Sequence, residues 1–422
     1  RQPSILEVVQ ELVALAHSFN TMAREISELI SNRTTLLALA GALAASSTLA
    51  GADTLKIGNT NPYSGPASAY GQIGRTIEAC IAMINEGGGI NGNTLEWISY
   101  DDGYSPPKTV EQTRRLVESD EVDILFQTLG TPTNTAIHKY VNAKKVPHLF
   151  VATGASKWGQ PDKYPFSMGW QPNYPTEAKI YAAYIRDNHA DGKIAILYQN
   201  DDYGKDYLAG FKEGLADAAD MIVAELPYET ADPTVDSQII SAKASGADIF
   251  FNITTPKFAA QAIKKAHEIG WQPVHFLNNV SSSVGSVLKP AGLDASTGII
   301  TAQYLMDPTD PQWADHQEYK DWVAFMDGHM PDGDKTSSFT LYGYAACKTL
   351  EHIVAEAGDD LSRENLMAKA ANINALRVPM LLPGVMVDTS PTDFYPIEAM
   401  QLSRFNGTSW ELFGDIISAE SD

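Results

Sequence analysis

Two short segments of the chain carry small and hydroxyl-bearing residues in a pattern that suits anion binding. They read Gly130-Thr131-Pro132-Thr133 and Ala152-Thr153-Gly154-Ala155-Ser156. Each follows an apolar run that predicts a buried strand, and the first one opens a predicted helix. Hydroxyl groups and backbone N–H groups at a helix amino end bind a carboxylate without a full positive charge, because the helix dipole assists them. The segments therefore predict a carboxylate subsite, although Thr133 could equally cap its own helix.

The residue types that support catalysis are scattered along the chain. His138, His148, His189, His267 and His275 form no recognisable set, and neither HExxH nor GxSxG occurs. The run of three glycines at 87–89 lacks the Lys-Ser/Thr of a phosphate-binding loop. Adjacent carboxylates at 101 and 102 would point apart on a strand end. The pattern predicts neither an enzyme nor a bound cofactor.

The two cysteines, Cys80 and Cys347, each lie among apolar residues of a predicted helix. This setting is typical of small buried hydrophobic residues. Neither belongs to a CxxC pair or has a histidine at metal-ligand spacing, so no metal site is expected. If the chain is exported, a single disulfide between them is an alternative, because oxidising compartments permit one.

The charge of the chain disfavours polyanionic partners. It has 422 residues, of which 52 are acidic and 30 basic, for a formal net charge of −22. Nucleic acid would be repelled by such a surface, whereas solubility explains the acidity without any partner. The hydrophobic fraction of 44% is ordinary for globular proteins, and the length suits two compact lobes.

Residues 33–52 follow the pattern of a secretory signal peptide. A positive charge at Arg33 precedes an apolar run, Leu36–Ala45, and the small residues Ala50-Gly51-Ala52 resemble a cleavage site. We expect cleavage near Ala52 and Asp53, and hence a mature protein in the periplasm. A permanent membrane anchor is the weaker interpretation, because the apolar run is too short to cross a bilayer.

Residues 1–32 predict a helical extension ahead of the signal peptide, one that the mature protein would lack. Apolar residues recur there at helical spacing, namely Leu12, Val13, Leu15, Ala16, Phe19, Met22, Ala23 and Ile26. The stretch from Glu11 to Glu25 resembles the second helix of a HAMP signalling linker.

From Thr54 onward, short β-rich runs alternate with amphipathic windows, which predicts an α/β fold with two Rossmann-like parallel sheets in series. The predicted strands are Thr54–Gly58, Leu95–Tyr100, Ile124–Gln127, His148–Val151, Lys193–Tyr198, Met221–Leu226, Ile249–Asn252, His275–Leu277 and Ile299–Ala302. The predicted helices are Ala69–Glu86, Pro106–Ser119, Thr133–Lys144, Pro175–Asn188, Asp202–Ala218, Ser237–Ala244, Lys257–Ile269 and Ser338–Ala357. Arg377–Phe413 reads as short β elements, with a hairpin at Asn406-Gly407.

The order of these pieces resembles the type I periplasmic binding proteins, specifically the branched-chain amino acid receptor family of ABC importers. The segments that carry the resemblance are Leu55–Gly71, Ile84–Gly92, Asp101–Pro106, Val146-Pro147, Ile194–Gly204, Gly246–Ile249 and Tyr342–Ala345. It implies two lobes joined by a multi-strand hinge, comprising residues 53–172 plus 303–385 and residues 173–302 plus 386–422. It also implies a monomer that closes around a small molecule and delivers it to permease subunits.

The resemblance implies that the ligand lies between the lobes, at loops after the strands. The first lobe would contribute Tyr63, Ser64, Gly130, Thr131, Thr133, Ala152, Thr153 and Gly154, and the second lobe Tyr203, Asn252, Thr254 and Thr255. Trp170 and Tyr174 would flank the first crossing between lobes, and Gln303, Tyr304 and Phe339 would lie near the return crossing. Trp170 and Tyr203 could instead serve only as packing.

The ligand is where the chain departs from the family pattern. Amino-acid receptors of this family resemble one another in offering an acidic group to the ligand's ammonium, commonly after the strand that here ends in Phe250–Lys257, where no acid stands. Burying an ammonium without a charged partner costs several kcal/mol. We therefore expect a carboxylate with an aromatic body. Asp201 or Asp202 could supply the missing anion, although such residues more often cap a helix.

Two alternatives remain open at this point. The chain could bind a branched-chain or other amino acid for the same class of importer. It could also present its ligand-bound form to a receptor kinase, which the HAMP-like helix would favour.

Overall fold

The computed structural model describes residues 9–10, 13–28 and 53–418, and it divides into two units, Arg1–Asp53 and Thr54–Asp422. In the first unit, residues 13–28 are helical and their side chains are exposed, which confirms the helical spacing predicted there. The predicted signal peptide, residues 33–52, lies outside the described residues. Within those residues, no helix has the length and apolar character that crossing a bilayer requires.

The second unit begins with a parallel sheet of order β2-β1-β3-β4-β5. Its strands are β1 (Thr54–Asn61), β2 (Thr94–Asp101), β3 (Ile124–Phe126), β4 (His148–Val151) and β5 (Ser167–Gly169). Its connections contain α2 (Gly71–Glu86), α3 (Pro106–Glu118) and α4 (Thr131–Ala143). β1, β3 and β4 are almost wholly buried, because helices cover a parallel sheet on both faces.

The second sheet has the order β12-β11-β10-β9-β8-β6-β7, and β13 pairs with β11 beside this path. Its strands are β6 (Ile194–Gln199), β7 (Ile222–Tyr228), β8 (Ile249–Ile253), β9 (Val274–Leu277), β10 (Ile300–Gln303), β11 (Ala399–Phe405), β12 (Trp410–Leu412) and β13 (Ile417–Ser418). Its helices are α5 (Tyr174–Asn188), α6 (Asp202–Leu215), α7 (Asp236–Ala244), α8 (Pro256–Glu268), α9 (Lys289–Ala291) and α10 (Leu293–Ser296). Strands β6 to β10 are parallel, whereas β11 runs antiparallel to β10.

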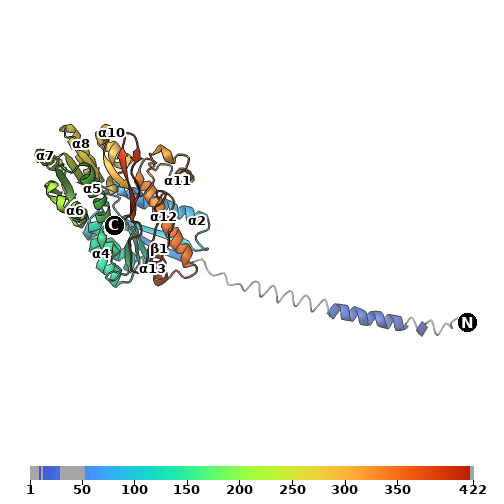
Figure 1. The fold of residues 1–422 in the computed structure, drawn as a ribbon. Coiled ribbons are helices and arrows are strands. Elements are labelled where there is room, and N and C mark those ends of the chain that lie inside the picture. Colours follow the sequence, from blue (N-terminus) through green and yellow to red (C-terminus); the bar gives the residue numbers. More distant parts are fainter. Residues whose placement is uncertain (1–8, 11–12, 29–52, 419–422) are drawn as a thin grey trace. The chain divides into compact units, whose positions relative to one another are not determined.

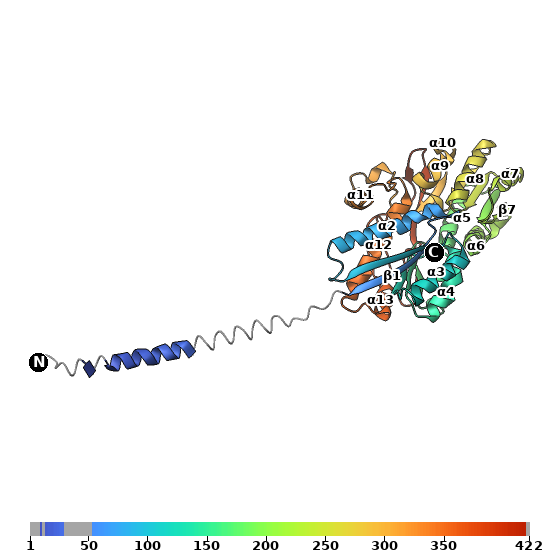
Figure 2. The ribbon, with the colours of Figure 1, turned by 180° about the vertical axis from the view of Figure 1, so that it is seen from behind.

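The chain crosses between the two sheets three times. It leaves the first sheet after β5, returns after β10 to α11 (Gln317–His329), α12 (Ser338–Ala357) and α13 (Arg363–Ala370), and then crosses again to β11. Helices α2 and α12 lie side by side in Figures 1 and 2. They approach closely at Gly343, where a Cβ would stand 2.9 Å from the carbonyl oxygen of Ile73. Two sheets with three crossings make the predicted two-lobed α/β fold.

A disulfide joins Cys80 of α2 to Cys347 of α12, across 267 residues of sequence. Both cysteines are fully buried as well, so they are core residues and a covalent link at once. Sequence patterns alone left these two roles as alternatives, because only the tertiary packing of α2 on α12 brings the sulfurs together.

Each predicted strand and helix is present, with ends shifted by a few residues at most. The predicted helix Ser338–Ala357 matches α12 at both ends, and the hairpin at Asn406-Gly407 is confirmed as β11 and β12. The short strand β5 and the helices α11 and α13 were not predicted. β5 has only three residues and includes Gly169, and α13 has a weak amphipathic pattern, so neither carries a strong local signal. The expected lobe bounds remain our proposal.

Candidate functional site

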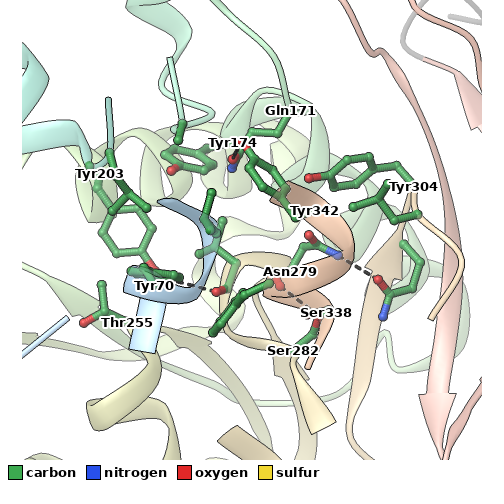
Figure 3. Close-up of a pocket in the computed structure, with 18 of the residues that line it drawn as sticks. Tyr70, Gln171, Tyr174, Tyr203, Thr255, Asn279, Ser282, Tyr304, Ser338 and Tyr342 are labelled. Carbon is green, nitrogen blue, oxygen red and sulfur yellow. Dashed lines mark hydrogen bonds between the residues drawn. The ribbon is translucent and has the colours of Figure 1, made fainter. Parts of the chain in front are cut away.

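A cavity of about 720 Å³, part of it open to solvent, lies where the loops of the two sheets and the crossing segments meet. Figure 3 shows side chains from several of these elements pointing toward one another around it. The lining residues are Tyr70, Ile73, Tyr104, Leu129, Gly130, Thr131, Ala152, Gln171, Tyr174, Tyr203, Thr255, Asn279, Val280, Ser282, Gln303, Tyr304, Leu305, Met306, Asp307, Ser338, Phe339 and Tyr342. Its position after strand ends is where open parallel sheets bind ligands.

Seven of the 22 residues that line the cavity are aromatic. In Figure 3, Tyr70 and Tyr203 lie on one side, Tyr304 on the other, and Tyr174 and Tyr342 between them. The rings of Tyr174 and Tyr203 meet edge to face, with centroids 5.3 Å apart. Burial raises the pKa of the Tyr174 phenol to about 12, so this hydroxyl is neutral at physiological pH. Such a wall offers large contact areas to a flat apolar ligand.

The amino end of α4 forms part of the wall. Gly130 has a φ of 100°, and a Cβ there would stand 2.5 Å from the Tyr104 ring, so only glycine fits. Thr131 begins the helix, and its N–H therefore has no acceptor one turn back within the helix. The hydroxyl of Thr131 lies 2.5 Å from that of Thr153, which also accepts a hydrogen bond from the Tyr174 hydroxyl at 3.1 Å. This end of α4 therefore presents neutral hydrogen-bond donors and a helix dipole to the cavity.

Six of the predicted site residues line the cavity together: Gly130, Thr131, Ala152, Tyr174, Tyr203 and Gln303. Thr255, Tyr304 and Phe339 line it as well. The other eight do not: Tyr63, Ser64, Thr133, Thr153, Gly154, Trp170, Asn252 and Thr254.

Several of those eight residues support the wall from behind. The indole N–H of Trp170 donates to Thr349 at 3.0 Å, and its ring packs edge-on against Tyr342. The Thr133 hydroxyl donates to the carbonyl oxygens of Leu129 and Gly130, so it neither faces the cavity nor caps its helix.

Others of the eight are held by polar partners. Thr254 donates to the Asn252 side chain at 2.6 Å, and the Gly154 carbonyl accepts from the backbone of Tyr174 at 2.7 Å. Tyr63 and Ser64 do not line the cavity. The hydroxyl of Tyr63 is hydrogen-bonded to that of Ser99, and the hydroxyl of Ser64 donates to the carboxylate of Asp101.

Asp307 lines the cavity and was missed by the sequence reasoning. It is 6% exposed, and its Oδ1 accepts hydrogen bonds from the backbone and side chain of Thr309. Burial raises the pKa of this carboxyl to about 6. The signal that could have found it is its place four residues beyond β10, since loops after parallel strands face the crevice.

The two acids considered from sequence have other roles. Asp201 accepts from the backbone N–H of Tyr203 at 2.9 Å and caps α6, as helix-capping preferences predict. Asp202 lies 2.5 Å from the Lys157 ammonium, and neither residue lines the cavity.

Glu177 of α5 lies behind the cavity and organises its floor. Its Oε1 accepts from the Tyr181 hydroxyl and from the backbone N–H of Asn279, both at 2.7 Å, and its Oε2 accepts from the Tyr207 hydroxyl at 2.7 Å. Asn279 lines the cavity, and the Tyr207 ring stacks on Tyr174 at 4.3 Å. One buried carboxyl thus holds both a polar and an aromatic part of the wall in place.

The loop after β4 is bonded to a helix of the second sheet. Asp206 of α6 accepts hydrogen bonds from the backbone N–H of Ser156 at 2.7 Å and from its hydroxyl at 2.8 Å. On the other side of the cavity, the hydroxyl of Tyr70 donates to the carbonyl of Val280 at 3.0 Å. These contacts hold the two lobes together around the site.

Replacing Asp206 by alanine removes two hydrogen bonds that join the loop after β4 to α6. We expect the affinity for a cavity ligand to fall by about 10-fold, because a ligand that bridges two lobes must then supply the lost closing free energy. Isothermal titration calorimetry measures this change. Asp217→Ala, at a position outside these contacts, is the control and should leave the affinity unchanged.

Two of the histidines considered for catalysis, His148 and His275, are buried in the core. His148 is fully buried and lies within hydrogen-bond distance of Thr128 and Asn134, and burial lowers its pKa to about 3. Burial likewise lowers the pKa of His275 to about 3. Both are neutral core residues. Among the described residues, no cluster of three or more potential metal ligands occurs.

A protein-family model described as periplasmic binding protein matches residues 54–409, which is most of the chain and every strand of both sheets except β12 and β13. The chain belongs to this family. It is a solute-binding protein of the periplasmic type and not an enzyme. The match also confirms the resemblance noted from the motifs.

Known relatives extend this picture. The chain is 23% identical to the leucine-, isoleucine-, valine-, threonine-, and alanine-binding protein of Pseudomonas aeruginosa, over 78% of this chain and 84% of that protein. Two solved structures of solute-binding proteins of ABC transporters, one from R. palustris in complex with benzoate and one from Rhodopseudomonas palustris BisB5 in complex with 3,4-dihydroxy benzoic acid, share its fold. Both are 20% identical and cover 87% of this chain and 98% of theirs, with TM-scores of 0.74 and 0.73 respectively.

Proposed function

We propose that the cavity binds a small aromatic carboxylate, which the mature protein carries in the periplasm, as a monomer, to the permease subunits of an ABC importer. The observation that carries this proposal is the amino end of α4 beside a wall of tyrosine rings. The helix end suits the carboxylate and the rings suit the aromatic body.

The charged groups around the cavity restrict where the carboxylate can bind, because Asp307 would repel it and the amino end of α4 offers it neutral donors. No lysine, arginine or histidine lines it among the described residues, so an anion would depend on neutral donors. A monocarboxylate needs only two or three such donors, whereas a multiply charged anion would need cations. The two structural relatives in complex with benzoate and 3,4-dihydroxy benzoic acid add support from the same fold.

An amino acid is the second candidate, and Asp307 is the observation that favours it. A buried carboxylate in the wall can pair with an ammonium group. The sequence has no such acid after the strand where amino-acid receptors of this family commonly have one. The curated relative from Pseudomonas aeruginosa is named for amino acids. The choice between the two ligand classes therefore requires a binding measurement.

Calorimetric titration of the mature protein with benzoate, 4-hydroxybenzoate and leucine separates the two candidates. We expect an aromatic acid to bind and leucine to bind at least 100-fold more weakly, because a leucine side chain gains no ring contacts in a tyrosine-lined cavity. Tight leucine binding with no response to either aromatic acid would show that the aromatic proposal is wrong.

Thr131→Val tests the carboxylate subsite. The variant keeps the shape of the side chain and removes a hydroxyl that faces the cavity, so we expect about 10-fold weaker binding of the aromatic acid. Thr133→Val is the matched control, because that hydroxyl donates to backbone carbonyls outside the cavity. Equal losses in both variants would count against the assignment.

A further inference from the structure

One wall of the cavity, formed by the segment at and after the end of β10, contains a hydrogen-bond donor without a partner. Gln303 is 6% exposed, and its Oε1 accepts from the Asn279 side-chain Nδ2 at 2.9 Å. The same Nδ2 donates to the carbonyl of Ala302 at 2.6 Å, which fixes the orientation of the Asn279 amide and hence that of Gln303. The Nε2 of Gln303 is buried and has no hydrogen-bond partner among the described residues.

The same wall contains an acceptor with spare capacity. Both hydrogen bonds to Asp307 go to Oδ1, and Oδ2 accepts none from the described residues. Gln303 and Asp307 both line the main cavity, and both also line a smaller adjoining space that has no room for a water molecule. The unpaired Gln303 donor is unfavourable unless something else satisfies it, and Oδ2 of Asp307 in the same wall offers an acceptor to whatever binds there.

The chemistry of the pair restricts what can satisfy both groups. A ligand carboxylate accepts but cannot donate, and Asp307 would repel it. An ammonium donates but cannot accept from the Gln303 amide. A hydroxyl does both, since it can donate to Oδ2 of Asp307 and accept from Nε2 of Gln303.

We propose that Gln303 and Asp307 form a subsite for a hydroxyl group on the ligand. This inference rests on the proposed function and narrows it, because the ligand class becomes a hydroxy-substituted aromatic acid. Its carboxylate lies at the amino end of α4 and its hydroxyl at the wall after β10.

The subsite should discriminate strongly between ligands with and without the hydroxyl. A hydrogen bond to a charged group, together with the cost of leaving both protein groups unpaired, corresponds to about 10- to 100-fold in affinity. Titration of the wild-type protein at pH 7.5 with benzoate, 3-hydroxybenzoate and 4-hydroxybenzoate measures this ratio. We expect at least one of the hydroxylated acids to bind at least 10-fold more tightly than benzoate.

Asp307→Asn tests the assignment with little change of shape. Its Oδ1 can still accept from Thr309, but an amide nitrogen replaces Oδ2, so the ligand hydroxyl faces two donors and loses its acceptor. We expect the preference for the hydroxylated acid to fall to about 1- to 3-fold. Asp310→Asn is the matched control. Asp310 lines the adjoining space but not the main cavity, and its Oδ1 accepts a hydrogen bond from the backbone N–H of Gln312. This variant should keep the full preference for the hydroxylated acid.

The results that would overturn the hydroxyl subsite differ from those that would overturn the proposed binding of an aromatic acid. Equal wild-type affinities for benzoate and both hydroxybenzoates would mean that water satisfies the pair, and the subsite proposal would then fail while the aromatic proposal stands. A preference that survives Asp307→Asn would also overturn the subsite. Binding of leucine without any aromatic acid would overturn both proposals.

Discussion

Replacing Glu177 by alanine is expected to lower the free energy of unfolding by about 3 kcal/mol at pH 5. The change leaves two tyrosine hydroxyls and the backbone N–H of Asn279 without their acceptor in a fully buried site. Each unsatisfied buried donor costs about 1–3 kcal/mol, and the lost side-chain volume adds a cavity penalty, although relaxation recovers part of the total. Urea unfolding followed by tryptophan fluorescence measures the change.

Glu213→Ala is the control for this experiment. Glu213 is exposed and accepts from Lys179 at 2.8 Å on the surface, and exposed ion pairs contribute about 0–1 kcal/mol. We expect this variant to unfold within about 0.5 kcal/mol of the wild type. A similarly small effect at Glu177 would mean that its three hydrogen bonds do not organise the floor of the cavity.

The raised pKa of Glu177 predicts that the stability of the folded state decreases as the pH rises. Burial raises the pKa of Glu177 from its ordinary value of 4.5 to about 7. As the pH rises, the unfolded chain loses this proton first, so the folded state loses stability between about pH 4.5 and 7, by about 3 kcal/mol in total. Glu177→Gln cannot titrate and lacks this dependence.

The difference between wild type and Glu177→Gln isolates the effect from other titrating groups. We expect the unfolding free energy of the wild type, relative to the variant, to decrease from pH 4.5 to about pH 7 and to level off at higher pH. A difference that is independent of pH, or one that increases with pH, would contradict the raised pKa.

Removing the disulfide is expected to cost about 4 kcal/mol of unfolding free energy. Cys80 and Cys347 are separated by 267 residues, so the bond closes a long loop and greatly restricts the unfolded chain. Both side chains are buried between α2 and α12, so Cys80→Ala/Cys347→Ala also loses a little packing. The guanidinium midpoint of the double variant, compared with that of the oxidised wild type, measures the loss.

A reducing agent provides the control for this experiment. It should lower the midpoint of the wild type toward that of the double variant and leave the variant unchanged. Ligand affinity should change little in either case, since neither cysteine lines the cavity. Equal midpoints for wild type and variant would show that the bond contributes nothing to stability.

Local sequence patterns were sufficient to predict most of the fold. The apolar spacing of Ser338–Ala357 and the turn preference of Asn406-Gly407 are properties of short stretches, and the structure agrees at both places. The alternation of strands and helices likewise restricts the chain to parallel sheets, because each crossover helix needs a sheet face to bury its apolar side. Such features depend on neighbours within a few residues of one another.

The wall of the site could not be predicted in this way. How deeply each side chain is buried, and which hydrogen-bond partner it has, depend on residues far apart in the sequence. Trp170 and Tyr174 are both aromatic and both follow β5, yet only Tyr174 reaches the cavity, while Trp170 donates to Thr349, 179 residues away. Asp307 carries no local motif, and its place in the wall depends on the second crossing, after β10, and on packing against residues near 380. The residue types available for a ligand can thus be read from the chain, whereas only tertiary packing decides which of them remain unpaired and face the cavity.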